Sequence, residues 1–340
     1  MKRSPIAAGL IAVCLLMVAP HGAAADPTVL RFASGQMPPV SPTDVPNFYK
    51  QWADRVTADS KGALTVDLRQ GMAIASVTNM YDRVLNDVVQ IGFVLFNYVE
   101  GKFPLAEVAA LPNTADNAEH GSRALWRIYQ SGALDSEFNE MKPLMLIVLP
   151  QSLVHLKAAP KSLVDLTGQR IVGPTQMTGL AAKYMGAQTI SLPSPAAYEA
   201  MTRGTADGTI LSWNVYFTFK IGEVAHYHID QSMGTAAGMI FMTRKVYDGL
   251  SPDAKAAIDK NSGEAASAEL AGWWDRDNAN NRNIAQHDAK QTVVTLPPDT
   301  AAKWEQRLDG ADAEWMQSRP GVDKVLAQYK QYLAEIKAGH

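Results

Sequence analysis

The segment formed by residues 165–214 constrains the fold of this chain most strongly. Strand and helix patterns alternate here in close succession, at residues 169–173, 178–186, 189–192, 194–204 and 209–211. The second helix opens with Ser194 and Pro195 and is closed by Gly204, which are favoured residues at these positions. This order predicts a parallel sheet flanked by helices. Ligands of such sheets bind outside the carboxyl ends of the strands, so functional residues are expected directly after each strand.

The rest of the chain shows the same mixture of patterns. Further strands are expected at residues 30–34, 64–68, 89–95, 144–149, 234–242 and 292–296. Further helices are expected at residues 44–58, 79–87, 117–132, 135–141, 252–287, 299–317 and 322–337. Trp52 is spaced from the other apolar residues of its expected helix so that it lies on the face that packs against the core. Of the adjacent Trp273 and Trp274, only one is expected to face any given surface, because neighbours on a helix point about 100° apart.

The first 25 residues have the pattern of a secretory signal peptide. Lys2 and Arg3 form a positive end, residues 6–18 form an apolar run, and three alanines precede Asp26. The apolar run is too short to span a bilayer comfortably. We therefore expect export to the periplasm, with cleavage after Ala25.

Composition narrows the class further. The only cysteine, Cys14, lies in the expected signal peptide, so the mature chain would have no disulfide, no cysteine nucleophile and no cysteine metal ligand. Losing Lys2 and Arg3 leaves 29 basic against 34 acidic residues, a net charge of −5. No basic patch suggests nucleic acid as a partner. The length suits two domains of roughly 150 residues each.

Signals of catalysis are weak. The chain has no Gly-x-Ser-x-Gly elbow, no Gly-x-Gly-x-x-Gly fingerprint and no P-loop. His226 and His228 alternate on an expected strand, but a metal site needs a further ligand, so a solvated surface pair is favoured. Asp207 and Glu223 have no spacing that defines an acid and base pair. We therefore predict a protein that is not an enzyme and has no cofactor or metal.

Several landmarks resemble one family in their order along the chain. They are Asp165-Leu166-x-Gly168-x-x-Ile171, Tyr198-Glu199-Ala200-Met201 with Gly204, Asp207-Gly208, Trp213, and outside this segment residues 30–34, 101–105, 111–112, 223–227 and 247–252. This series resembles the DctP-type solute-binding subunits of tripartite (TRAP) transporters over nearly the whole mature chain. Each motif alone has low specificity, but the shared order is specific.

The resemblance implies an α/β, two-lobed periplasmic-binding-protein fold with crossing strands at the hinge and a long bracing helix. Residues 26–150 and about 237–275 would form lobe I, and residues 151–236 and about 276–340 would form lobe II. The implied function is capture of a small organic solute in the interlobe cleft and delivery to the small and large permease subunits of the membrane. The alternative is a periplasmic solute-sensing protein that feeds a signalling kinase.

One departure from the family concerns the ligand. Relatives usually carry a carboxylate-clamping arginine two residues after the position of Arg170, where this chain has Val172. A second arginine of some members falls near Ser152. Arg170 could still reach a ligand oxygen, or it could form a salt bridge. The apolar replacements disfavour a bare dicarboxylate and favour an organic acid with an apolar or aromatic body, or a less anionic ligand.

Ten residues are predicted to bind the ligand from this resemblance and from their places after strands. They are Phe96, Asn97, Ser152, Arg170, Val172, Thr175, Leu211, Trp213, Asn214 and Tyr216. Trp213 is the expected platform, because an indole offers a stacking face and a donor at its edge. For Phe96, closure of a core layer is the alternative. Gly35, after the first strand, could let backbone approach a ligand or only turn the chain.

Overall fold

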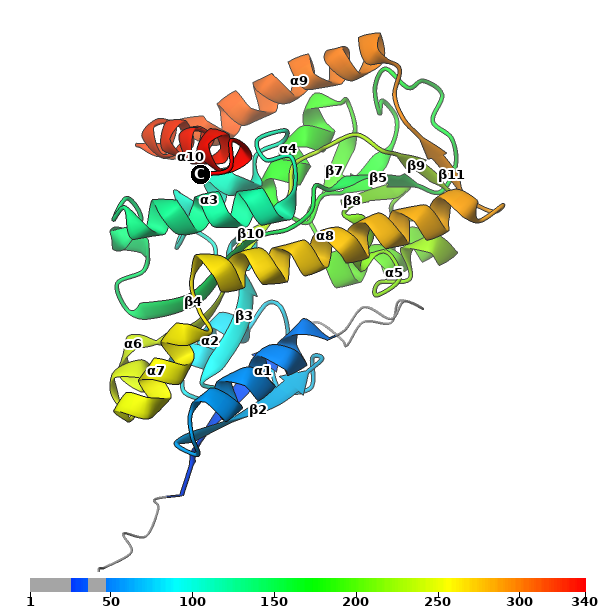
Figure 1. Cartoon of the computed structure of the whole chain (residues 1–340). Helices are drawn as coiled ribbons and strands as arrows, with labels where there is room; N and C mark the ends of the chain where they lie inside the picture. The colour runs from blue at the N-terminus through cyan, green and yellow to red at the C-terminus, as the bar shows by residue number, and fades with distance from the viewer. Residues whose placement is uncertain (1–25, 36–46) are drawn as a thin grey trace, which may run out of the picture.

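The computed structural model describes residues 26–35 and 47–340. The predicted signal peptide and most of the loop after the first strand lie outside these residues. Two β-sheets, each with helices packed on it, form the two lobes of the molecule (Figure 1). The predicted α/β fold with two lobes is therefore confirmed. No helix among the described residues is both long enough and apolar enough to cross a membrane.

Lobe I is built on a five-stranded sheet. Its order is β2 (Leu64–Gln70), β1 (Thr28–Ser34), β3 (Ile91–Leu95), β10 (Ala237–Thr243) and β4 (Met141–Val148). β1 pairs in parallel with β2 and β3, whereas β10 runs antiparallel to β3 and β4. The helices of this lobe are α1 (Phe48–Asp59), α2 (Met80–Leu85), α3 (Ala118–Gln130), α6 (Arg244–Asp248) and α7 (Pro252–Lys260). Trp52 is fully buried, as predicted from its spacing.

Lobe II is built on a six-stranded sheet. Its order is β11 (Thr292–Val294), β9 (Tyr227–Ile229), β5 (Leu153–Leu156), β8 (Gly208–Leu211), β6 (Arg170–Val172) and β7 (Gln188–Ile190). β6 is parallel to β7 and to β8, so the parallel arrangement predicted for residues 165–214 is confirmed. The connecting helices are α4 (Gln176–Tyr184) and α5 (Ala197–Thr202), the latter preceded by a 3-10 turn, η4 (Ser194–Ala196). The carboxyl ends of β6 and β8 face lobe I.

Two extended segments cross between the lobes and lie side by side. The first joins β4 to β5 through residues 149–152, and the second leads from β9 to β10 through residues 230–236. The amide of Leu149 donates to the carbonyl of Ala236 (2.9 Å), and the amide of Ser152 donates to the carbonyl of Gly234 (2.8 Å). The Thr235 hydroxyl adds a bond to the Leu149 carbonyl (2.8 Å). These bonds tie the two crossings into one hinge.

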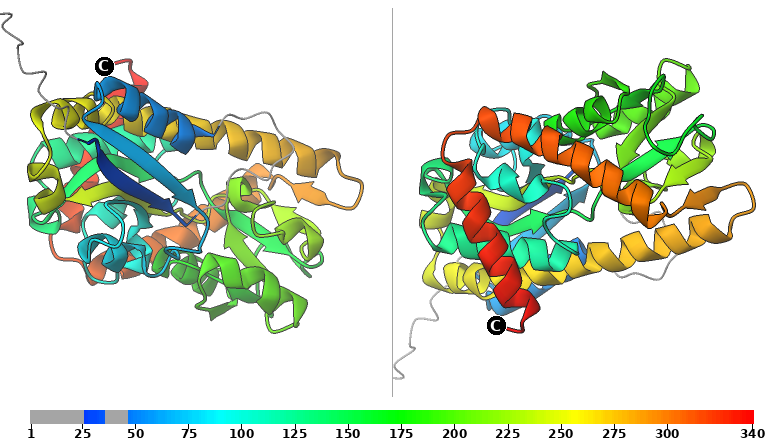
Figure 2. Two further views of the ribbon diagram at one scale, coloured as in Figure 1. Left: turned by 90° about the horizontal axis from the view of Figure 1, so that it is seen from below. Right: turned by 90° about the horizontal axis from the view of Figure 1, so that it is seen from above.

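The long helix α8 (Glu264–His287) runs past both lobes, as Figure 2 shows. It packs on α3 and β4 in lobe I and on β11 in lobe II. The prediction of one helix from residue 252 to 287 is wrong, because the chain breaks between α7 and α8. Gly263 has a φ of +99°, a backbone angle that residues with a side chain rarely adopt. Its amide donates to the Leu144 carbonyl (2.8 Å).

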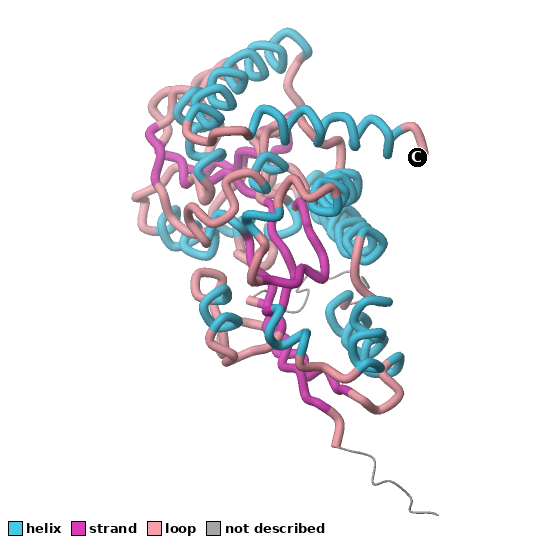
Figure 3. Tube along the Cα trace, turned by 90° about the vertical axis from the view of Figure 1, so that its left-hand side faces the viewer, coloured by secondary structure: helices cyan, strands magenta, loops and turns pink. Residues whose placement is uncertain are grey.

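Two other expectations differ from the structure. The helix predicted for residues 135–141 is a single 3-10 turn, η3 (Asp135–Glu137), because Met141 already begins β4. The last two helices are α9 (Pro298–Gln317) and α10 (Val322–Lys337). α9 packs on α4 of lobe II, whereas α10 returns to α3 of lobe I (Figures 1 and 3). The C-terminal segment is therefore shared between the lobes rather than placed wholly in lobe II.

Gly238 allows β10 to sit between its neighbours. A Cβ at this position would overlap the backbone oxygen of Val94 on β3. We expect Gly238→Ala to lower the free energy of unfolding by about 2 kcal/mol or more, since the obstacle is backbone that cannot rotate away. Urea unfolding followed by circular dichroism measures the change.

The matched control is Gly249→Ala, where the nearest atoms to the new Cβ lie at 3.5 Å and φ is −75°. This variant should stay within about 0.5 kcal/mol of the wild type. Equal stability of the two variants would contradict the close approach of β10 and β3.

Candidate ligand-binding site

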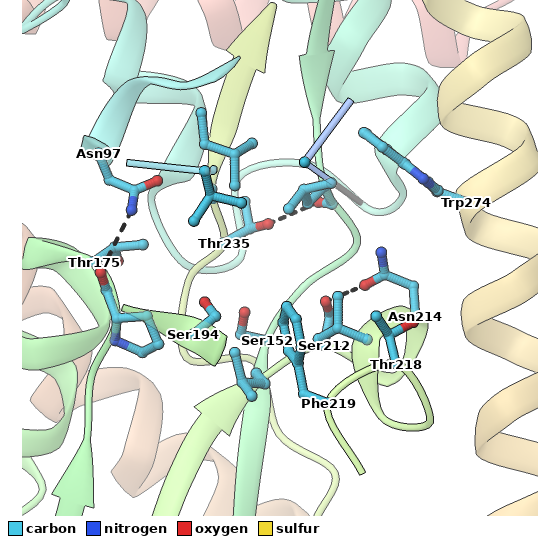
Figure 4. A pocket seen from close by; sticks show the side chains of 18 of the residues that line it. Asn97, Ser152, Thr175, Ser194, Ser212, Asn214, Thr218, Phe219, Thr235 and Trp274 are labelled. Atoms are coloured by element: carbon cyan, nitrogen blue, oxygen red, sulfur yellow. Dashed lines mark hydrogen bonds between the residues drawn. The ribbon is translucent and has the colours of Figure 1, made fainter. Parts of the chain in front are cut away.

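A cavity with about 1100 Å³ of empty space, part of it open to solvent, lies between the lobes at the hinge. Side chains from both lobes, from the crossing segments and from α8 line it (Figure 4). Lobe I contributes β3 and the turn η1 (Phe96–Tyr98) after it, and lobe II contributes the ends of β6 and β8. The site therefore lies at the carboxyl ends of strands, where the sheet pattern places ligands.

Aromatic rings form much of the cavity wall. Trp274 of α8 packs edge-on against Phe93 of β3, with ring centroids 5.6 Å apart. Trp273 packs against Tyr49 of α1 at 6.5 Å. All four side chains line the cavity. Both adjacent tryptophans thus line it, contrary to the expectation that only one would, since Trp273 packs on Tyr49 of α1 and Trp274 on Phe93 of β3.

Hydroxyl groups supply most of the polar lining. Ser152, Thr175, Ser194, Ser212, Thr218 and Thr235 all contribute to it (Figure 4). Hydroxyls can donate and accept, so they adapt to either kind of ligand group. The Ser212 hydroxyl is bonded to the side-chain oxygen of Asn214, and Thr175 caps α4 by accepting from the amide of Thr178 (3.0 Å).

The face of α8 toward the cavity carries a buried carboxylate. Trp273, Asp277 and Asn281 recur every four residues and therefore lie on one side of the helix. Asn281 Nδ2 donates to Asp277 Oδ2 (3.2 Å) and to the Trp213 carbonyl (3.1 Å). Asp277 Oδ1 is buried without a hydrogen-bond partner in the described part of the chain. Burial raises the pKa of Asp277 to about 6.

In the described part of the cavity lining, no cation balances this carboxylate. Among residues 26–35 and 47–340, no arginine, lysine or histidine lines the cavity. The adjoining sequence 36–46 also contains none of these three residue types. Negative charge in the cavity must therefore be met by hydroxyls, amides and the indole N–H.

Five of the ten predicted ligand residues line the cavity: Asn97, Ser152, Thr175, Leu211 and Asn214. Gly35, at the end of β1, lines it as well. Asn97 Nδ2 reaches across the cleft to the Pro174 carbonyl (3.4 Å), and its Oδ1 is buried without a partner among the described residues. The lining residues that were predicted from the ends of strands thus come from lobe I, the hinge and lobe II.

Arg170 lies away from the cavity, at the amino end of β6. Its Nε and Nη2 donate to the two carboxylate oxygens of Asp207, at 2.9 and 2.7 Å. These bonds hold the pKa of Asp207 below its usual value. The structure thus shows the salt bridge that was the alternative to a ligand contact.

Val172 and Phe96 are also absent from the cavity wall. Val172 is fully buried in the core of lobe II, because helices cover both faces of a parallel sheet and leave no free side for β6. Phe96 stacks on Phe103, with ring centroids 4.5 Å apart, and packs against Phe138. The core-layer alternative for Phe96 is the observed arrangement.

Trp213 and Tyr216 support the wall from behind. Trp213 begins the turn η5 (Trp213–Val215), is 1% exposed, and packs against His155 and His228, with centroids 4.9 Å apart in each case. Tyr216 packs on the same indole at 5.1 Å. Neither ring lines the cavity, whereas both tryptophans of α8 do, so the expected position of Trp213 on the cavity wall is wrong.

The histidine expectation is corrected too. His228 is fully buried rather than solvated, and His226 alone is exposed. His228 pairs across β9 and β5 with His155, and their Nδ1 atoms lie 2.8 Å apart. His155 Nε2 donates to the Leu211 carbonyl (3.2 Å). Across the described residues, no three histidine, cysteine or acidic side chains are grouped as metal ligands.

The sequence analysis did not predict that Trp273, Asp277 and Asn281 line the cavity. Their four-residue spacing on an expected helix was the available signal, since it places an indole, a carboxylate and an amide on one face. Buried acidic and amide side chains on an apolar face need partners, and a ligand is one source of them.

The fold and the cavity define a two-lobed receptor for small solutes. Residues 39–318 match the family of bacterial extracellular solute-binding proteins, family 7, named DctP. The chain therefore belongs to the DctP family of TRAP solute-binding proteins. Receptors of this family act outside the cytoplasm and are not enzymes.

Relatives and solved structures agree with this assignment. The outer membrane transporter protein TsaT of Comamonas testosteroni is 23% identical over 302 residues, covering 82% of this chain and 86% of TsaT. A TRAP solute binding protein of Rhodoferax ferrireducens T118, solved with copurified benzoate, has a TM-score of 0.83 and 28% identity, covering 92% of this chain and 100% of that one. A marine metagenome TRAP protein described as specific for aromatic acid ligands, solved with metahydroxyphenylacetate, has a TM-score of 0.82 and 27% identity, covering 91% and 99%.

The buried histidine pair makes the wall behind the cavity sensitive to acid. Burial lowers the pKa of His228 to about 4 and lowers that of His155 as well. Between about pH 6.5 and 4 the unfolded chain binds more protons at these positions than the folded chain does. We therefore expect the two histidines to reduce the free energy of unfolding by on the order of 2 kcal/mol between pH 7 and pH 5.

The measurement is urea unfolding at both pH values for the wild type and for His155→Gln/His228→Gln. The double variant should lose less stability on acidification, since glutamine does not titrate. His287→Gln, at an exposed position, should keep the wild-type pH dependence. Equal pH dependence of stability in all three proteins would show that folding does not lower the pKa values of His155 and His228.

Proposed function

We propose that this protein captures a small solute with an aromatic or apolar body in the interlobe cavity. It works outside the cytoplasm, exported through the leader at residues 1–25, and delivers the solute to a membrane permease of one small and one large subunit. The observation that carries the proposal is the cavity itself. Tyr49 and Phe93 of lobe I, the tryptophan pair of α8, and Phe217 and Phe219 of lobe II line one space.

The shape and size of the cavity support an aromatic guest. Ligand sites for small molecules are mostly apolar, with a few polar groups that orient the ligand, and this lining has that composition. Two structural relatives were solved with an aromatic acid bound, benzoate in one and metahydroxyphenylacetate in the other. Simple diacids fit poorly, because their two carboxylates would lose hydration on entering the cavity and the described lining has no cation to compensate for that loss.

Contacts across the cleft mouth support closure as the transport signal. The Tyr98 hydroxyl of η1 lies 3.3 Å from the Ser194 hydroxyl of lobe II, and it accepts from the Ser194 amide at 3.3 Å. A second link between the lobes is made by Arg319, whose Nη2 donates to Glu107 of lobe I (3.0 Å) and to Gln176 of lobe II (2.7 Å). A ligand that touches both lobes favours this closed arrangement, because it binds the closed state more tightly than the open one.

Ligand-linked stabilisation tests the proposal directly. We expect at least one of benzoate, 3-hydroxybenzoate and benzamide to raise the melting temperature and to lower the radius of gyration in small-angle X-ray scattering. Succinate, which has no apolar body, should do neither. Stabilisation by succinate alone, or scattering that is unchanged by every stabilising compound, would contradict the proposal.

The Tyr98–Ser194 contact should contribute to closure. We expect Tyr98→Phe to weaken binding of the best aromatic compound by roughly fivefold, the effect of one net hydrogen bond of about 1 kcal/mol. Both residues also line the cavity, so each single variant can lose direct ligand contacts. A double-mutant cycle with Ser194→Ala separates the two effects, because only a shared contact makes the two losses non-additive. Additive losses would mean that the contact between the two hydroxyl groups does not hold the lobes together.

A further inference from the structure

The structure assigns a selecting role to Asp277: its free carboxylate oxygen accepts a hydrogen bond from a donor at the polar end of the solute, so the receptor prefers amide, hydroxyl or ammonium compounds over the matching carboxylates. This inference rests on the proposed function, because it concerns the same cavity. It goes further in naming the chemical class of the polar end.

The first support is the way Asp277 is held. The residue is 6% exposed and lines the cavity from α8. Asn281 binds only one of its two carboxylate oxygens, Oδ2, and is itself anchored to the Trp213 carbonyl. The other oxygen, Oδ1, has no partner among residues 26–35 and 47–340. Buried polar atoms almost always have a partner, so an unsatisfied acceptor on a cavity-lining side chain is consistent with a donor on the ligand.

The second support is a neighbouring donor with the same property. Trp273 lies one helical turn before Asp277, lines the cavity and is 8% exposed. Its indole Nε1–H is also buried without a partner within the described part of the chain. An acceptor and a donor side by side on one helix face match a solute group that has both, such as an amide or a hydroxyl.

The third support is the charge of the cavity. The described lining holds one carboxylate and no arginine, lysine or histidine. A ligand carboxylate placed against Asp277 would bring two like charges together in a poorly solvated space, which disfavours the ionised state of at least one of them. A neutral or cationic donor meets Asp277 without that repulsion. The same reasoning explains how a single carboxylate can discriminate between ligands of equal shape.

Benzamide and benzoate test this directly, because they share a shape and differ in a donor and a charge. Isothermal titration calorimetry at pH 8 should show benzamide binding the wild type at least tenfold more tightly than benzoate. Asp277→Asn removes the charge and presents an amide that can also donate. In this variant the affinity for benzamide should fall and the affinity for benzoate should rise. The preference for benzamide over benzoate should then be less than threefold.

Glu269→Gln is the matched control on the same helix. Glu269 is exposed and paired with Arg55, away from the cavity lining, so both affinities should stay at wild-type values. Thermal unfolding of each variant confirms folding. If Asp277→Asn does not fold, the wild-type preference among benzamide, benzylamine and benzoate decides the question by itself, with benzoate expected to be the weakest.

The outcomes separate the two proposals. Benzoate binding as tightly as benzamide, with closure in scattering, would overturn the role of Asp277 and leave the receptor function in place. An unchanged preference in Asp277→Asn would likewise overturn it. Failure of these three compounds and of 3-hydroxybenzoate to bind would contradict both the proposed function and this inference.

Discussion

Backbone hydrogen bonds between the two crossing segments hold the cavity in place, and the rest of the site depends on them. The segments at residues 149–152 and 230–236 are bonded to each other, so each lobe pivots on a paired ribbon rather than on a single strand. Ser152 and Thr235 belong to this ribbon and line the cavity floor. α8 connects the lobes a third time. Its buried face lies next to the hinge and lines the cavity, which is the arrangement that hinge closure around a ligand would require.

Charge decides what such a cavity can hold. Arg170 and Asp207 neutralise each other at the amino end of β6, and the other arginine of the central segment, Arg203, pairs with Glu199, so both guanidinium groups are used within lobe II. The described wall offers aromatic faces, hydroxyls and the single carboxylate of Asp277 instead. In a buried space a charge without a partner is costly, whereas an aromatic body gains from leaving water. In the proposed function, apolar contact therefore supplies the affinity and a few directed polar groups supply the selection.

The sequence predicted the two-lobed fold, the parallel order in lobe II and five of the ten proposed wall residues, and the reasons for the misses are specific. A parallel sheet is buried on both faces, so alternation along β6 could not show that Val172 belongs to the core. An aromatic residue after a strand can close a core layer or face a ligand, and Phe96 and Trp213 do the former. The break before α8 depends on Gly263, whose unusual φ is tied to a hydrogen bond with distant Leu144.

By itself, the sequence determined the family, the alternation of strands and helices and the strand ends at which the cavity forms. These properties follow from hydrophobic periodicity, cap residues and the order of motifs, all of which can be read from short segments without knowledge of the tertiary contacts. Only the tertiary structure decided that Trp273, Trp274 and Asp277 line the cavity while Trp213 and the His155–His228 pair lie behind its wall. The physical reason is that a side chain's exposure depends on which distant elements cover it, and here α8 and the hinge bring together residues more than one hundred positions apart.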